Sequence, residues 1–179
     1  MRADDPHPPT YYHVVSTDLP PCGLYRTTKP IGSLEGGRLV YFHNHGDPGP
    51  GVYQPESWNG NRAKFSANGT TVPAGFDYKS LRPLPPEGFY RVSKPFHCCE
   101  KQCVKYEPDA FVQLGYNGKG QAIVFVPELG ARSIDIPDRG TFVEDNVLPN
   151  LELLKLAEKR GGDGGPEIDI KLPRGIVVH

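Results

Sequence analysis

The chain has 179 residues, of which 37% are hydrophobic and 23% charged, and its formal net charge is −1. This balance is typical of a folded globular protein, and it gives no broad positive field for nucleic acid or an anionic membrane. The 21 glycines and 20 prolines disfavour long helices and favour many short strands joined by tight turns.

Residues 1–17 are predicted to be an N-terminal leader. The leader is acidic and rich in proline, and it lacks the apolar core of a secretory signal. No apolar run in the chain approaches the roughly 18 residues that a membrane span needs. The four cysteines are too few and too clustered for a secreted disulfide scaffold. These features predict a cytoplasmic protein with reduced cysteines and no membrane partner.

An internal repeat begins directly after the leader. Residues 19–31, LPPCGLYRTTKPI, match residues 84–96, LPPEGFYRVSKPF, at eight of thirteen positions with an offset of 65. A second match follows in the same order, since the segment from Trp58 resembles the segment from Tyr116, and both contain an Asn-Gly pair typical of hairpin turns. Two matches in order predict an internal duplication.

The length of each copy indicates the kind of fold. About five short strands in a repeat of 65 residues suit a small, strongly bent SH3-like β-barrel better than a β-sandwich, which usually needs about 100 residues. The sequence therefore predicts an all-β protein with a first barrel unit at residues 18–83 and a second at residues 84–148.

In the first copy, a strand predicted at residues 39–45 carries two histidines. Strand alternation places Tyr41, His43 and His45 on one face, and paired imidazoles there can share a metal ion. The spacing Gly37-x5-His43-x-His45 resembles the opening of the cupin metal motif, which implies a cupin enzyme as one alternative. The Glu and the further His of that motif are missing after His45. The pair is interpreted as a binding surface or as an incomplete metal site.

The following segment, GDPGPGVYQPESW at residues 46–58, is rich in Gly and Pro and ends in aromatic residues. Such segments form shaped loops, and small β-barrels bind proline-rich peptides in aromatic grooves. The alternative for Trp58 is a place in the core, because Tyr116 occupies the matching position of the second copy. The predicted binding residues are Tyr41, His43, His45, Asp47, Tyr53 and Trp58.

The second copy alone carries a cluster of cysteines, HCCEKQC at residues 97–103. Three or four soft ligands hold zinc, and His97, Cys98, Cys99 and Cys103, with Cys22 in reserve, are sufficient in number. The spacing differs from Cys-x2-Cys, and adjacent cysteines on a strand point to opposite faces. Reduced structural thiols, a zinc or iron site, and a redox disulfide or reactive thiol all stay open.

The end of the chain departs from the repeat. Leu151 and Leu154 share one helical stripe, so residues 149–160 are predicted to form a short helix, followed by a Gly-rich linker. Alternating residues then predict a tail strand at residues 167–179. Exchange of this strand with a second copy is a route to a homodimer.

No motif in the sequence assigns a reaction. There is no Gly-rich phosphate loop, Gly-x-Ser-x-Gly or His-Glu-x-x-His, so no catalytic residue is assigned. The preferred hypothesis is a non-catalytic scaffold that binds a protein or peptide. The alternative is a metal-binding protein that uses zinc or iron, and the third is an enzyme with His43 or Cys103 as base or nucleophile.

Overall fold

The structure is a computed structural model that describes residues 19–155, 157–158 and 168–169. In these residues it consists of short strands, two 3₁₀ helices and turns, and every strand pair is antiparallel. The predicted all-β class is confirmed. The predicted leader lies outside the described residues. Within the part of the chain that the structure describes, no helix has the length and apolar character that crossing a membrane requires.

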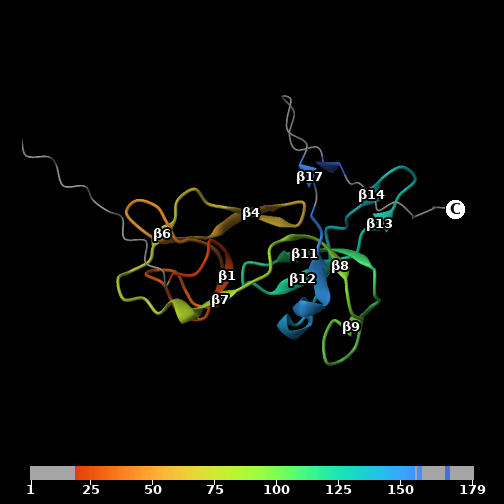
Figure 1. Ribbon diagram of the computed structural model, residues 1–179, viewed down its shortest axis with the longest axis horizontal. Coiled ribbons are helices and arrows are strands. Elements are labelled where there is room, and N and C mark those ends of the chain that lie inside the picture. Colours follow the sequence, from red (N-terminus) through yellow and green to blue (C-terminus); the bar gives the residue numbers. More distant parts are fainter. Residues whose placement is uncertain (1–18, 156, 159–167, 170–179) are drawn as a thin grey trace, which may run out of the picture.

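The first half of the chain forms a five-stranded sheet with the order β6-β3-β2-β1-β7. A one-turn 3₁₀ helix, η1, precedes the last strand, which returns to pair with the first. In Figure 1 this body is drawn in red to yellow-green. The bounds are Gly23–Thr27 for β1, Leu39–His43 for β2, Gly51–Tyr53 for β3, Thr70–Thr71 for β6, Tyr78–Ser80 for η1 and Leu81–Pro83 for β7.

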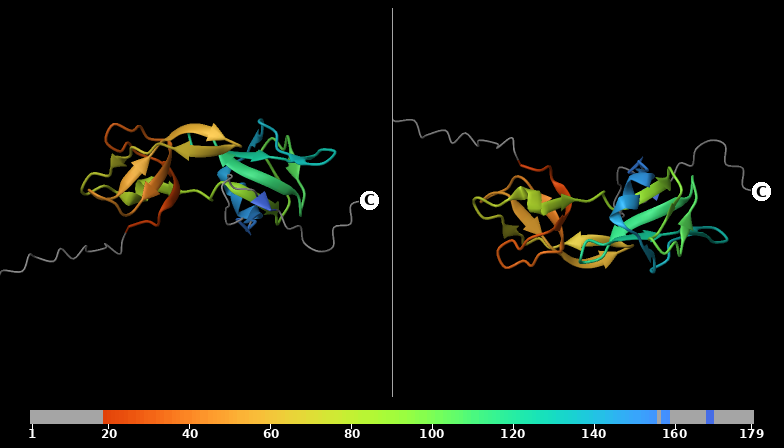
Figure 2. Two further views of the ribbon diagram at one scale, coloured as in Figure 1. Left: turned by 90° about the horizontal axis from the view of Figure 1, so that it is seen from above. Right: turned by 90° about the horizontal axis from the view of Figure 1, so that it is seen from below.

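The second half forms a five-stranded sheet with the corresponding order, β15-β12-β11-β8-β16. A 3₁₀ helix, η2, again precedes the last strand, and that strand again pairs with the first strand of its sheet. The two bodies lie side by side in both views of Figure 2. The bounds are Gly88–Val92 for β8, Phe111–Tyr116 for β11, Ala122–Phe125 for β12, Thr141–Phe142 for β15, Asp145–Asn150 for η2 and Leu151–Leu153 for β16.

The two Leu-Pro-Pro segments are held in the same way. Tyr25 and Tyr90, which match in the repeat, are both buried, and each hydroxyl donates a hydrogen bond to the carbonyl oxygen of a proline four residues earlier. The distances are 2.7 Å to Pro21 and 2.6 Å to Pro86. Because a buried hydroxyl needs a partner, this bond ties each Leu-Pro-Pro segment to the strand that follows it.

The second sequence match does not join equivalent elements. The segment from Trp58 lies in a separate hairpin, β4 (Pro55–Asn59) and β5 (Arg62–Phe65), whereas Tyr116 ends β11 in the main second sheet. The predicted correspondence is therefore wrong. Both segments need a tight turn between two strands, and the shared Asn-Gly chemistry reflects that local need.

The β4–β5 hairpin extends from the first body to the second, as the yellow ribbon in Figure 2 shows. At its tip, Asn61 Nδ2 donates to Gln113 Oε1 at 3.1 Å, and Gln113 Nε2 donates to Gly60 O at 2.8 Å. Gln113 is only 2% exposed, so this reciprocal pair satisfies an amide that would be costly to bury alone.

Three further contacts join the two bodies. Glu87 Oε2 accepts a hydrogen bond from the Ala63 backbone N–H at 2.9 Å, and burial raises the pKa of the Glu87 carboxyl. Arg26 of β1 forms an ion pair with Asp145 of η2. Leu39 is fully buried within the hydrophobic cluster of the second body, so the two bodies share part of one core.

The end of the chain differs from its prediction. The expected helix at residues 149–160 is absent from its described part, because η2 ends at Asn150 and Leu151–Leu153 is strand β16. Leu151 pairs with Val92 of β8, and this pairing to the sheet edge prevails over a helical stripe that is only two leucines long. The second unit therefore extends beyond residue 148. Most of the tail strand and the Gly-rich linker lie outside the described residues.

Six short strands complete the described secondary structure in addition to those above. β9 (Phe96–His97) pairs with β10 (Lys105–Tyr106), and β13 (Glu128–Leu129) pairs with β14 (Ile134–Asp135). Within the predicted tail, β18 (Ile168–Asp169) pairs with β17 (Ala157–Glu158).

Replacing Gly115 with alanine is expected to weaken the junction. A Cβ at this position would lie 2.4 Å from the Asn61 carbonyl oxygen, so the hairpin must move away. We expect Gly115→Ala to lower the free energy of unfolding by about 1–3 kcal/mol, measured by urea denaturation. Gly118→Ala is the control, since its nearest contact would be an ordinary 3.7 Å from the Trp58 ring. Equal stability of the two variants would contradict the tight junction.

Candidate functional site

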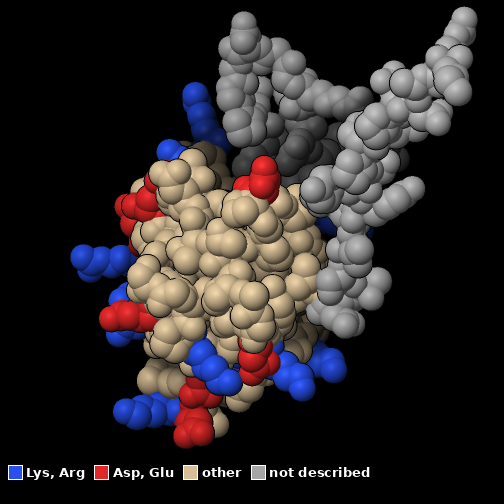
Figure 3. Space-filling view, turned by 90° about the vertical axis from the view of Figure 1, so that its left-hand side faces the viewer, with Lys and Arg blue, Asp and Glu red and all other residues tan. Residues whose placement is uncertain are grey.

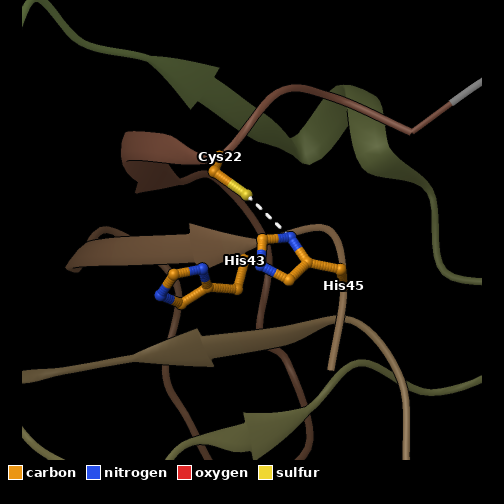
Figure 4. A group of neighbouring side chains, drawn as sticks. All are labelled: Cys22, His43 and His45. Carbon is orange, nitrogen blue, oxygen red and sulfur yellow. Dashed lines mark hydrogen bonds between the residues drawn. The ribbon is translucent and has the colours of Figure 1, made fainter. Parts of the chain in front are cut away.

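The register of β1 and β2 brings Cys22 to the histidine pair. Gly23 pairs with Phe42, so the next residues outward on the two strands, Cys22 and His43, lie opposite each other. His45 follows β2 in a turn and comes back towards Cys22 (Figure 4). One donor atom of each of these three side chains lies within 4.8 Å of the others.

Local hydrogen bonds position the thiol. The Asn44 backbone N–H donates to Cys22 Sγ at 3.3 Å, and the thiol lies 3.1 Å from Asn44 Oδ1. Cys22 Sγ is 3.5 Å from His45 Nδ1, the contact drawn as a dashed line in Figure 4. The cysteine is half-buried and His45 is exposed, so the group opens to solvent on the His45 side.

His43 has an unsatisfied ring nitrogen. Its Nδ1 is buried and has no hydrogen-bond partner among the residues that the structure describes. Aromatic rings surround it, with centroid distances of 4.8 Å to Tyr41, 5.3 Å to Tyr53 and 5.4 Å to His45. Because buried polar atoms are nearly always paired, this nitrogen indicates a role for the ring beyond packing.

The group has the composition of a zinc site with an open position. Two imidazoles and one thiolate are borderline and soft donors, and zinc commonly takes three such ligands and leaves the fourth position to water or a ligand. The sequence showed the histidine pair without a third ligand, and Cys22 supplies it. The sequence predicted Cys22 only as a reserve ligand for the cysteine cluster of the second copy, which carries Glu87 at the position that matches Cys22.

The same residues place the thiol and an amide oxygen at one ring nitrogen of His45. In such a pair the histidine contacts the nucleophile with one ring nitrogen and an orienting group with the other. Here Cys22 Sγ and Asn44 Oδ1, the latter at 3.0 Å, both lie next to Nδ1 of His45. The geometry therefore suits coordination of one metal ion by these side chains better than transfer of a proton from the thiol through the imidazole to an orienting group.

A second group of donors lies in the loop between β9 and β10. The sulfurs of Cys98, Cys99 and Cys103 lie within 4.8 Å of one another. His97 is part of β9 and does not join this group, and Cys22 belongs to the other group. The adjacent cysteines converge because they lie in a turn and not on a strand, so strand alternation does not separate their thiols. All four cysteines of the chain are free.

The pKa values of two of these thiols are shifted in opposite directions. A hydrogen bond from the Cys98 thiol, with a sulfur–sulfur distance of 3.5 Å, and backbone N–H groups lower the pKa of Cys99. The hydrogen bond with Cys99 raises the pKa of Cys103. Cys98 is buried and Cys103 is exposed. The cluster thus favours a thiolate at Cys99.

Part of the predicted binding surface forms an aromatic hollow of about 400 Å³ beside the histidines. Of the residues predicted to bind, Tyr41, His43 and Tyr53 line it, and β5 adds Phe65. Asp47 is exposed in the loop and does not line the hollow. Trp58 is neither core nor part of the hollow, because it is 45% exposed and donates its indole N–H to Tyr116 O at 2.8 Å across the junction. The complete lining is Tyr41, His43, Tyr53, Phe65, Ser66 and Ala67.

Comparison with known proteins does not identify a relative. The chain matches no protein-family model, and no curated protein or solved structure gives a significant match. The function is therefore argued from the two donor groups and the aromatic hollow.

Limited alkylation tests the arrangement of the thiol loop. With iodoacetamide at neutral pH, we expect Cys99 to be labelled before the more exposed Cys103, because the thiolate is the reacting form. Peptide mass spectrometry of samples quenched at short times measures the order. Unfolded protein serves as the control, in which both sites should react at similar rates. Faster labelling of Cys103 in the folded protein would contradict the hydrogen-bond pattern.

Proposed function

We propose that this protein binds zinc through Cys22, His43 and His45. The observation that carries this proposal is the convergence of three soft or borderline donors from two separate segments, within 4.8 Å of one another. The Nδ1 of His43, which has no hydrogen-bond partner among the described residues, supports the proposal. In a metal-bound histidine one ring nitrogen binds the ion and the other makes a hydrogen bond, so both nitrogens have a function. The three ligands hold the ion and leave a fourth position for water or a small ligand.

Two further features of the fold support this proposal. Cys22 already accepts a backbone hydrogen bond from Asn44, which stabilises negative charge on the sulfur. His43 is fixed by the rings of Tyr41 and Tyr53, which limits its rotation. Prepositioned ligands lose little conformational entropy on binding, so a site built in this way binds more tightly than flexible side chains do.

Metal analysis of the full chain, purified without a histidine tag, tests the zinc site. We expect stoichiometric zinc in the wild type and its loss in Cys22→Ser, with Cys103→Ser as the matched control that removes a thiol outside the site. Replacement of zinc by cobalt should give a sulfur-to-cobalt charge-transfer band that Cys22→Ser abolishes and Cys103→Ser keeps. Absence of metal from the wild type after zinc loading, or equal loss in both variants, would refute the assignment.

We infer further that the two bodies are SH3-like units related by duplication. The support is their common strand order, with the last strand pairing to the first after a 3₁₀ helix, together with the repeated Leu-Pro-Pro segment and the matching hydrogen bonds of Tyr25 and Tyr90. Two units with one strand order and one conserved local contact are more simply explained by copying than by independent origin.

A second candidate function is peptide binding at the aromatic hollow of the first unit. Small β-domains bind proline-rich peptides on aromatic surfaces, and Tyr41, Tyr53 and Phe65 provide such a surface. At the end of the first unit that faces away from the second, charged side chains lie mainly around the margin of a region with little charge (Figure 3). This distribution suits an uncharged extended peptide better than a polyanion.

A library of proline-rich peptides tests this second candidate. We expect binders that perturb the NMR signals of Tyr41, Tyr53 and Phe65, and we expect Tyr41→Ala to weaken binding about tenfold or more, the loss of roughly one buried aromatic contact. Phe142→Ala is the control, because Phe142 is exposed on the second unit. Binding that is insensitive to Tyr41→Ala would place the peptide elsewhere and reject the hollow.

A further inference from the structure

The loop between β9 and β10 in the second unit forms a donor group of its own. It contains only sulfur, from Cys98, Cys99 and Cys103. No described histidine or carboxylate joins these three sulfurs at the same spacing. The first donor group, by contrast, contains one sulfur and two imidazoles, so the two groups differ in chemistry as well as in place.

The backbone of the loop is fixed at several points. The Cys98 N–H donates to Val104 O at 2.9 Å, and the Cys98 carbonyl accepts from the Glu144 N–H at 3.1 Å. Across the turn, the Gln102 N–H donates to Cys99 O at 2.9 Å. These bonds hold the ends and the middle of the loop, which keeps the three cysteines close to one another.

The sulfurs have the separation and the environment of metal ligands. Bonds of about 2.3 Å from one ion to three thiolates place the sulfurs about 4 Å apart, and the observed group lies within 4.8 Å, with 3.5 Å between Cys98 and Cys99. The Val104 N–H donates to Cys98 Sγ at 3.3 Å. Backbone N–H groups that point at sulfur stabilise the charge of thiolate ligands.

We propose that Cys98, Cys99 and Cys103 form a trigonal thiolate site for a soft monovalent ion, Cu(I). A donor set of three thiolates is softer than one thiolate with two imidazoles, and soft thiolate ligands select soft ions such as Cu(I). The exposure of the three ligands is graded, from buried Cys98 to exposed Cys103. The ion enters and leaves at Cys103, where an incoming thiol can replace a ligand. This proposal does not depend on the zinc site of the first unit.

Cu(I) competition measures this site directly. The full chain carrying Cys22→Ser, which disables the first donor group, is reduced, stripped of metal and titrated without oxygen with Cu(I) held by bicinchoninate. We expect the protein to remove one ion per chain from the competitor and to gain an ultraviolet copper–thiolate band. X-ray absorption should show a shell of three sulfurs and no nitrogen.

The paired variants make the result decisive. Addition of Cys103→Ser to Cys22→Ser should abolish uptake, and because Cys103 is exposed this change is not expected to disturb the fold, which circular dichroism checks. Failure of the Cys22→Ser protein to take Cu(I), equal uptake with Cys103→Ser, or retention of zinc in preference to copper would overturn the proposal. Loss of zinc from Cys22→Ser alone reports on the first unit, so failure of one site is distinguishable from failure of the other.

Discussion

The pairing of β1 with β2 is the constraint on which the first unit depends. In this register Gly23 lies opposite Phe42, and Phe42 is fully buried in the core. A shift of one residue would reverse the face of every side chain on the strand, so burial of Phe42 fixes the register. The same register places Cys22 opposite His43. The position of the candidate metal site thus follows from the packing of the core. No additional strand or helix is needed to bring Cys22 next to His43.

The second unit has the same strand order as the first but carries different side chains at the corresponding positions. At the position of Cys22 it carries Glu87, and this carboxylate accepts a hydrogen bond from the β4–β5 hairpin of the first unit. Where the first unit has a cysteine-free turn at residues 32–37, the second unit has the thiol loop. Positions just outside the first strand and in the following turn tolerate such changes, because they lie at the edge of the core and not within it.

The β4–β5 hairpin makes the two units interdependent. Its tip places Asn61 against Gln113 of β11, and its flank bonds to Glu87. These are buried or half-buried polar contacts, which cost free energy when one partner is removed. Leu39 adds an apolar contact on the other side, within the core of the second unit. The junction therefore joins the two units through polar and apolar contacts together.

The sequence by itself determined the β class, the Leu-Pro-Pro repeat, the histidine pair and the run of cysteines, because composition, periodicity and motif identity are local properties. It did not determine that Cys22 joins His43 and His45, that Cys98 and Cys99 converge, or that Trp58 lies at the junction. The first depends on strand register, and the second depends on a turn, to which strand alternation does not apply. The third depends on the β4–β5 hairpin, which extends from the first body to the second. Such juxtapositions arise from backbone pairing between distant segments, and only the tertiary structure decides that pairing.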